Sequence, residues 1–499
     1  MANAGSWISN PQSSRLRYSP CRRGFGARGC VAEGPWQPIH YSNIDETTTA
    51  LLYSSSSRHS PLSSPSTRAT ISKMDFSLSD HQLLIRDTVR EFMNAEVRPH
   101  VKDWERTDHF PLDAIQKLGA LGCCGMLVPE EWGGPGLDAI SYVLMLEEVA
   151  KVHTAISTAL GVTNSAVQLP LLAHGTTQQK ERYLRRLSSG EILGAFCLTE
   201  PAAGSDAAGI QTRAERVCRG RSSDRPGELA SSAPPSTEKT EGCHPDPVVQ
   251  AFRPEGSALS TTRHYVLNGT KTWVTNGSHA GVYLIFAKTD PSAAGKGITA
   301  FLVEPNTPGL KIGRHEEKMG QRSSPSVELI LNNCMVPEEN RLGDEGAGLK
   351  IALSALDGGR IGIAAQAVGL AQGALDESVK YARARKAFGK SIGEFQAIQW
   401  MLADMHTELE AARALLYQAA FLKDSEAKMG SAASRAKLYG SEMVNRVVYK
   451  AVQIHGSLGY SRESEVERMY RDARVISIYE GTSEIQRTII ARDLLKSSL

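Results

Sequence analysis

The sequence lacks three features that would assign it to a specialised class of protein. No apolar run reaches the roughly 18 residues that a membrane-spanning helix needs, so we expect no integral membrane segment. Cysteine is scarce, with eight in 499 residues, and no pair has the C-x-x-C spacing of a metal site. We therefore predict free thiols, a reducing compartment and no bound metal. A basic surplus is absent from most of the chain: residues 1–74 have eight Lys and Arg against three Asp and Glu, but the remainder has 48 against 51. That balance argues against nucleic acid as a partner.

The length and composition are those of a globular protein with several domains. A chain of 499 residues predicts about three domains of the usual size, and 41% hydrophobic with 22% charged residues is ordinary for such a chain. Residues 1–74 are rich in Ser and Arg and show no sustained hydrophobic period. They predict a segment without a fold of its own, either an organelle transit peptide or an incorrectly extended start.

The hydrophobic period divides the rest of the chain into three parts. Residues 75–195 show helical spacing, with a capping box at Ser79 and Gln82, and we predict an all-helical domain. Residues 196–340 contain short β-rich runs and predict a middle, mostly antiparallel β domain. Residues 341–499 are helical again and predict a four-helix bundle. The fold class is therefore α+β.

Two details of the β domain can be tested by a structure. Asn268 and Gly269 stand between two β-rich runs, which predicts a two-residue hairpin turn. Residues 217–262 have Pro, Ser and Arg in excess and no period. They predict an insertion that is either a disordered surface loop or a gene-model artefact absent from the mature protein.

A candidate for chemistry lies near the C-terminus, in I-S-I-Y-E-G-T-S-E-I-Q-R at residues 476–487. Glu480 stands between an aromatic residue and a glycine, after β-branched residues, so we expect its carboxylate at a partly dry turn. Such an environment raises a carboxyl pKa and suits a general base. An isolated Glu-Gly pair is more often an ordinary turn, and the other motifs decide between the two interpretations.

The octapeptide Y-E-G-T-S-E-I-Q resembles the catalytic signature of the acyl-CoA dehydrogenases. Three further blocks occur in the order that this family requires: F-C-L-T-E-P-A-A-G-S-D (196–206), L-N-G-T-K-T-W-V-T-N-G (267–277) and R-K-A-F-G (385–389). The resemblance extends from about Phe76 to Leu495 and is greatest to the short-chain, butyryl-CoA type. Ala202 and Ser457 stand where the family often has glycine.

The resemblance implies FAD as cofactor and Glu480 as the catalytic base. Relatives that act on isovaleryl groups have their base immediately before Arg360, but this chain has Gly359 there. Substrate contacts are implied for Ser205, Asp357, Arg360 and Gly481. FAD contacts are implied for Phe196, Leu198, Thr199, Gly204, Ser205, Trp273, Val274, Thr275, Arg385, Lys386, Ala387, Phe388, Gln396, Gln453, Gly456, Ser457, Thr482, Ser483 and Glu484. Of these, Arg385, Gln396 and residues 453–457 are expected from the neighbouring subunit of a dimer.

The implied reaction is the α,β-dehydrogenation of a short-chain acyl-CoA to the trans-2-enoyl-CoA, in fatty-acid or branched-amino-acid catabolism. Electrons would pass to electron-transfer flavoprotein, and the expected assembly is a homotetramer, a dimer of dimers, in the mitochondrial matrix. Three alternatives remain: a 2-methylbutyryl-CoA dehydrogenase, an acyl-CoA oxidase, and a non-catalytic flavoprotein scaffold or assembly factor. The closing K-S-S-L resembles a peroxisomal signal and is interpreted as chance.

Overall fold

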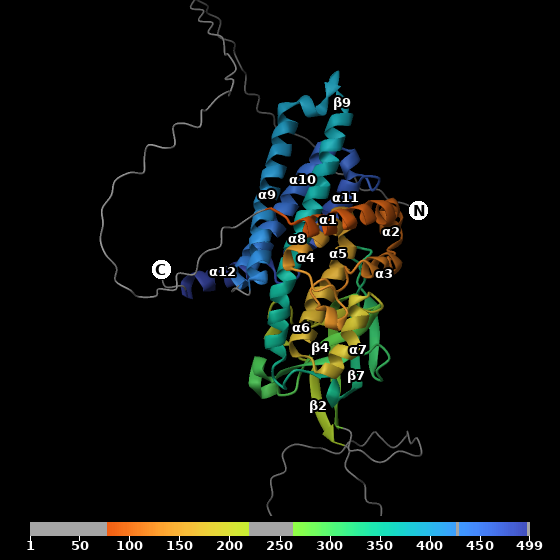
Figure 1. Ribbon diagram of the computed structural model, residues 1–499, viewed down its shortest axis with the longest axis vertical. Coiled ribbons are helices and arrows are strands. Elements are labelled where there is room, and N and C mark those ends of the chain that lie inside the picture. Colours follow the sequence, from red (N-terminus) through yellow and green to blue (C-terminus); the bar gives the residue numbers. More distant parts are fainter. Residues whose placement is uncertain (1–76, 219–262, 426–428, 497–499) are drawn as a thin grey trace, which may run out of the picture. The chain divides into compact units, whose positions relative to one another are not determined.

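The computed structural model describes residues 77–218, 263–425 and 429–496 (Figure 1). The predictions for residues 1–74 and for nearly all of segment 217–262 lie outside the described residues. None of the described helices is both long enough and apolar enough to span a membrane. The cysteines at 123, 124, 197 and 334 are buried and unbridged, as predicted for free thiols.

The N-terminal part is helical, as predicted. Helix α1 (Asp80–Phe92) begins at the expected capping box, in which the Ser79 hydroxyl accepts from the Gln82 N–H and the Gln82 side chain accepts from the Ser79 N–H. The α-helices that follow are α2 (Val101–Thr107), α3 (Leu112–Ala120), α4 (Ala139–Val152), α5 (Thr154–Gly161), α6 (Leu169–His174) and α7 (Thr177–Ser188). A π-helix, η4 (Val162–Gln168), joins α5 to α6.

The middle part is a largely antiparallel sheet, also as predicted. Its strands are β1 (Leu193–Cys197), β2 (Arg213–Cys218), β3 (Arg263–Thr275), β4 (Ala280–Lys288), β5 (Ile298–Val303), β6 (Leu310–His315), β7 (Ser326–Pro337) and β8 (Arg341–Leu342). The order is β6-β7-β3-β2-β4-β5-β8, and β1 pairs with β4 in parallel. Every residue of β5 is buried, because the sheet is covered on both faces there.

The predicted hairpin at Asn268 and Gly269 is wrong. Strand β3 continues through both residues, and its ladder with β7 shifts register between Leu267 and Gly269. The Asn268 side chain accepts from the Asn333 N–H at 2.7 Å, and Gly269 has a φ of 153°. A β-bulge therefore uses the residues that favour a turn, because long partners on both sides keep the strand extended.

The C-terminal part is helical, as predicted. It contains α8 (Gly348–Ala384), α9 (Gln396–Asp424), α10 (Gly430–His455), α11 (Glu465–Ala473) and α12 (Ser483–Lys496). A small hairpin of β9 (Lys386–Ala387) and β10 (Lys390–Ser391) lies between α8 and α9. Helix α8 packs against α4, α9 and α10, and α12 packs against α10 (Figure 1).

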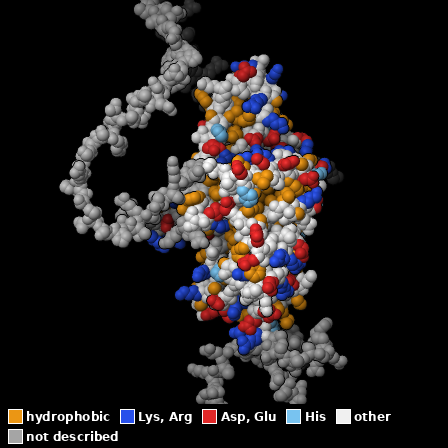
Figure 2. All heavy atoms as spheres, viewed as in Figure 1, with side chains coloured by type: hydrophobic (Ala, Val, Ile, Leu, Met, Phe, Trp, Pro, Cys, Tyr) orange, Lys and Arg blue, Asp and Glu red, His pale blue; other side chains and the backbone are white. Residues whose placement is uncertain are grey.

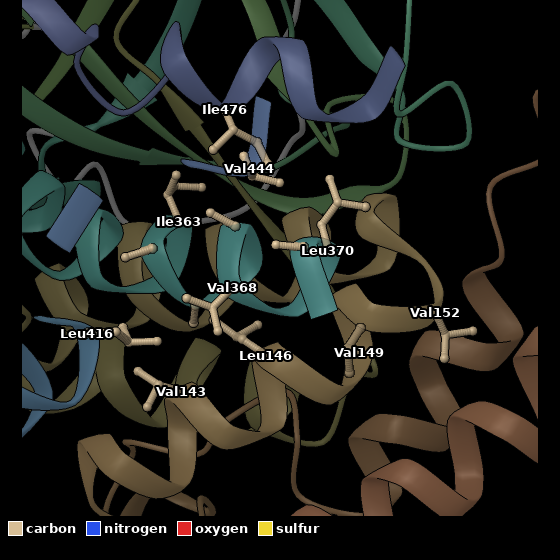
Figure 3. Packing of buried hydrophobic residues seen from close by; sticks show 14 of the residues in the cluster. Val143, Leu146, Val149, Val152, Ile363, Val368, Leu370, Leu416, Val444 and Ile476 are labelled. Carbon is tan, nitrogen blue, oxygen red and sulfur yellow. The ribbon is translucent and has the colours of Figure 1, made fainter. Parts of the chain in front are cut away.

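Glycines on α8 allow its close approach to α4. A Cβ at Gly369 would lie 2.2 Å from the carbonyl oxygen of Glu147, and one at Gly373 would lie 2.5 Å from that of Lys151. Each glycine costs a helix about 1 kcal/mol relative to alanine, and the tight packing offsets this cost. Figure 3 shows Leu146 of α4 beside Val368 of α8, and Val143 of α4 beside Leu416 of α9, in this shared core.

Candidate active site

Glu480 lies on a strained turn between α11 and α12. Its φ is 53° and that of Gly481 is 85°, so two consecutive residues are left-handed. This conformation is uncommon for a residue with a Cβ, and such strain is concentrated at functional sites. The Gln486 side chain holds the turn, because its Nε2 donates to the carbonyls of Glu480 at 3.1 Å and Gly481 at 3.0 Å.

A buried cation also holds this turn. Lys437, on α10, is 0% exposed, and its Nζ donates to the Gly481 carbonyl at 2.8 Å. Burial lowers the pKa of Lys437 to about 8, and the neighbouring Glu480 opposes that change. Sequence reasoning missed this residue. The signal was present, because Lys437 occupies the buried face of a helix otherwise marked by Ala433, Gly440 and Val444.

The Glu480 carboxyl group has the environment that was expected from the sequence. The residue as a whole is half-buried, but its Oε2 atom is enclosed and has no hydrogen-bond partner among the described residues. Burial raises the pKa of Glu480 to about 7, against the effects of Arg360 and Lys437. A carboxyl group with that pKa is divided between acid and base at neutral pH, as proton transfer requires.

The carboxyl group of Glu480 lies against Gly359 on α8. A Cβ at Gly359 would be 2.5 Å from Oε2, so the absence of a side chain makes room for the Glu480 carboxylate. Arg360 follows directly and is 6% exposed, with its guanidinium paired to Asp357. Thus the structure brings Asp357, Arg360, Glu480 and Gly481, four of the predicted site residues, close together.

A network of polar side chains holds Tyr479, the residue that precedes Glu480. The Tyr479 hydroxyl donates to Gln366 of α8 and accepts from Gln321 at 3.3 Å. Gln366 donates in turn to Thr158 of α5 at 2.6 Å. The network connects the middle sheet region with two helices of the other parts, and so fixes the residue before Glu480. No motif or period in the sequence marked these amides.

A second group of predicted residues lies in the β domain. The Thr272 N–H donates to the Thr199 carbonyl at 2.9 Å, and the Lys271 ammonium donates to the Leu198 carbonyl at 3.3 Å. The next residue, Trp273, has a φ of 58° and is 56% exposed. An aromatic ring in this position offers a flat apolar face to a partner.

The other predicted residues of this group differ in their exposure to solvent. Phe196 is half-buried with its ring 5.0 Å from that of Phe286, and Val274 is buried in the core, which leaves only its backbone for a ligand. Thr275 is half-buried, whereas Gly204 and Ser205 are exposed.

Thr482, Ser483 and Glu484 form the start of α12. The Thr482 hydroxyl accepts from the Ile485 N–H at 3.3 Å. The Ser483 hydroxyl is enclosed and has no partner within the described part of the chain, while Glu484 is exposed. These residues follow the Glu480 turn directly.

The remaining predicted residues lie at the other end of α8. Ser391, beside the hairpin, donates to the Ala382 carbonyl at 2.7 Å, and His455 stacks on Tyr381 with ring centroids 4.4 Å apart. These contacts gather Arg385, Lys386, Ala387, Phe388, Gln396, Gln453, Gly456 and Ser457 at the C-terminal end of α8. With 1.5 Å per helical residue, this end is about 40 Å from Gly359.

One chain therefore does not bring all predicted FAD residues together. The hairpin strand β9 and the sheet strands β2, β4 and β7 lie toward opposite ends of α8 (Figure 1). The hairpin end is also apolar at its surface: Phe388 is 95% exposed and Trp400 is 62% exposed. In Figure 2, hydrophobic side chains are visible over this end of the helices.

Comparisons with known proteins show the family of this chain. Sequence models of the acyl-CoA dehydrogenase N-terminal, middle and C-terminal domains match residues 79–191, 236–334 and 346–495. The chain is 41% identical over 417 residues to the mitochondrial short-chain specific acyl-CoA dehydrogenase of Mus musculus, across 84% of this chain and 90% of that protein. It is 40% identical to the caffeyl-CoA reductase-Etf complex subunit CarC of Acetobacterium woodii, across 84% of this chain and 99% of that one.

A solved structure extends the similarity to the fold. Butyryl-CoA dehydrogenase from Megasphaera elsdenii matches with a TM-score of 0.74 at 39% identity, across 85% of this chain and 100% of that chain. The three domain matches and these relatives identify the class of the protein as a flavoprotein oxidoreductase of the acyl-CoA dehydrogenase type, and the order of a helical part, a middle sheet and a helical part agrees with it. The chain belongs to the acyl-CoA dehydrogenase family.

The residues present fit the FAD that this family uses. The Trp273 indole is exposed on a left-handed backbone, so its face is free to stack on a ring. The hydroxyls of Thr272 and Ser483 are enclosed without a partner in the residues that the structure covers, which suits hydrogen bonds to a polar ligand edge. The indole face and the two hydroxyl groups are the kinds of contact that a flat ring with polar edges makes with a protein.

Proposed function

We propose that the protein dehydrogenates short-chain acyl-CoA thioesters to trans-2-enoyl-CoA, with Glu480 as the base. The observation that carries this proposal is the enclosed Glu480 carboxyl group beside Gly359, whose pKa burial raises to about 7. In its ionised form Glu480 accepts the α-proton of the substrate. Its own backbone N–H, at the left-handed turn, polarises the thioester carbonyl as an oxyanion donor. FAD, when bound, accepts the β-hydrogen as hydride.

The predicted site residues divide between substrate and cofactor. Asp357, Arg360, Ser205 and Gly481 contact the acyl-CoA, with Arg360 held by its ion pair to Asp357. Leu198, Thr199 and Trp273–Thr275, with Phe196 and Gly204, hold the flavin ring, and Thr482, Ser483 and Glu484 contact the cofactor near Glu480.

The adenine half of FAD is bound by a second subunit. The separation of about 40 Å along α8 between the Glu480 turn and the hairpin residues supports this proposal, because it is too long for one cofactor to contact both groups within a single chain. Arg385, Lys386, Ala387, Phe388, Gln396, Gln453, Gly456 and Ser457 of one subunit then complete the site of its neighbour. A dimer is the minimal active unit, and the assembly is a homotetramer.

The partner and location follow the relatives. An acceptor of the electron-transfer flavoprotein class takes the electrons, in line with the Etf complex named for one relative. Residues 1–74 act as a transit peptide to the mitochondrial matrix, in line with the mouse relative, whose name describes it as mitochondrial. The three domains span residues 75–195, 196–340 and 341–499.

The test is turnover on butyryl-, octanoyl-, palmitoyl- and 2-methylbutyryl-CoA, using purified flavin-loaded protein and an artificial electron acceptor. We expect a maximum at butyryl-CoA, and a loss of about 10² to 10⁴ in rate for Glu480→Gln with flavin absorbance unchanged. A maximum at 2-methylbutyryl-CoA would replace the straight-chain substrate by a branched one. No turnover on any thioester, despite bound flavin, would contradict the enzyme and favour a scaffold.

A further inference from the structure

Lys437 is a buried cation whose amine is directed at the Glu480 turn. It lies on α10, far in sequence from the turn, and is 0% exposed. A buried lysine is costly unless its charge is compensated. Its Nζ donates to the Gly481 carbonyl at 2.8 Å, but that carbonyl already accepts from Gln486 at 3.0 Å. The hydrogen bond alone therefore does not require a charged residue there.

The positive charge of Lys437 affects the ionisation of Glu480. Two cations oppose the effect of burial on Glu480: Arg360 from α8 and Lys437 from α10. The other titratable groups that interact with Glu480 are the phenols of Tyr142 on α4 and Tyr479, whose pKa values are raised by burial. Both phenols are neutral near pH 7, so the two cations are the charges that favour an ionised Glu480.

The two cations are not equivalent. The guanidinium of Arg360 is paired to Asp357, which compensates its charge locally. Lys437 has no carboxylate within ion-pair distance among the described residues. Of the neighbouring charges, Glu480 affects its pKa most, Arg360 acts in the opposite direction, and Glu442 and Glu484 have smaller effects. The strongest electrostatic interaction of the Lys437 ammonium with a carboxyl group is therefore with Glu480.

We propose that Lys437 is a positioning residue for the base: its ammonium group holds the Glu480–Gly481 turn through the Gly481 carbonyl, and its charge favours the ionised form of the Glu480 carboxyl group. This inference rests on the proposed function, because it assumes that ionised Glu480 removes the proton. Lys437 is 0% exposed, so we assign it no contact with substrate or cofactor, and it acts through Glu480. The fixed Gly481 carbonyl also fixes the planar peptide that follows it, and so the start of α12.

Two variants separate the charge from the hydrogen bond. Lys437→Met removes both and keeps a similar length, whereas Lys437→Gln removes the charge and keeps a donor. Replacing a buried charge by an apolar group of similar volume is often neutral or stabilising, and Gln486 still satisfies the Gly481 carbonyl. Lys450→Met is the matched control, since Lys450 lies about 20 Å farther along α10 and pairs with Glu408 at 3.1 Å.

The first readout is the pH profile of kcat/KM for butyryl-CoA with flavin-loaded protein. Loss of the cation should move the acid limb upward by about one pH unit, which is about a tenfold loss on the acid side and little loss at high pH. Lys437→Met and Lys437→Gln should shift alike, and Lys450→Met should not shift. A purely structural role would lower the whole profile without moving the limb.

The second readout does not depend on turnover. The carboxylic C=O stretch that disappears in Glu480→Gln identifies the Glu480 titration by infrared difference spectroscopy. We expect this titration at higher pH in both Lys437 variants. An unchanged titration in folded Lys437→Met and Lys437→Gln overturns the role of Lys437, even if Glu480→Gln is inactive. Full activity of Glu480→Gln instead overturns the proposed base, which is a separate failure.

Discussion

A single methyl group at Gly359 should separate activity from stability. The Cβ of Gly359→Ala would lie 2.5 Å from Oε2 and 2.9 Å from the carboxyl carbon of Glu480. Non-bonded contacts are comfortable at about 3.5 Å, so the carboxyl group must retreat by about 1 Å. A displacement of that size at a reacting group costs about 10²-fold in rate. The folded state should not suffer, because alanine favours a helix over glycine by about 1 kcal/mol and the displaced group ends a flexible side chain.

The assay compares kcat/KM for butyryl-CoA and the thermal unfolding midpoint in the same preparations. We expect Gly359→Ala to lose about 100-fold in kcat/KM and to unfold at the same or a higher temperature. Gly161→Ala is the control, since a Cβ there would meet nothing within 4 Å. Unchanged activity in Gly359→Ala would refute the position assigned to the base, and a large loss of stability would refute the packing argument.

Three further predictions follow from the same contacts. Glu480 binds its proton more tightly in the folded protein, since burial raises its pKa to about 7 from 4.5. The stability that it adds is present at low pH and lost as pH rises toward 7, so Glu480→Gln should gain stability over the natural protein at pH 8 but not at pH 4, measured by urea unfolding. Lys271→Met should cost about 3 to 5 kcal/mol in the same assay, because it leaves Glu200 buried and unpaired, and a loss below 1 kcal/mol would contradict this. Phe388→Glu should weaken subunit association in analytical ultracentrifugation and lower flavin content, whereas an intact, flavin-loaded oligomer would contradict the shared site.

The sequence predicted the site where local chemistry determines local structure. Glu480 before a glycine, after apolar residues, indicated a dry turn, and the structure has that turn in a left-handed conformation. The helical period likewise predicted the helical part at residues 341–499, which contains α8, α9 and α10. In these segments the same residues determine both the pattern and the conformation.

The wrong prediction of a hairpin and the missed residues have one physical cause: contacts between segments that are far apart in the sequence. Asn268 and Gly269 favour a turn locally, but pairing of β3 with β2 and β7 converts the turn into a bulge. Lys437 was missed because a lysine on a helix is usually solvated, and only the packing of α10 against the Glu480 turn encloses it. The partners of Tyr479 are equally distant in sequence, so no local pattern identifies them.

The pairing of β2 with β3 does not depend on the length of the segment that connects the two strands. Cys218 and Arg263 are register partners in an antiparallel ladder, so their Cα atoms are about 5 Å apart. A two-residue turn could connect them, and so could a connection of any greater length, at an entropic cost that grows only slowly with length. Splicing or gene-annotation differences at this junction would therefore change the length of the protein and leave its catalytic framework intact.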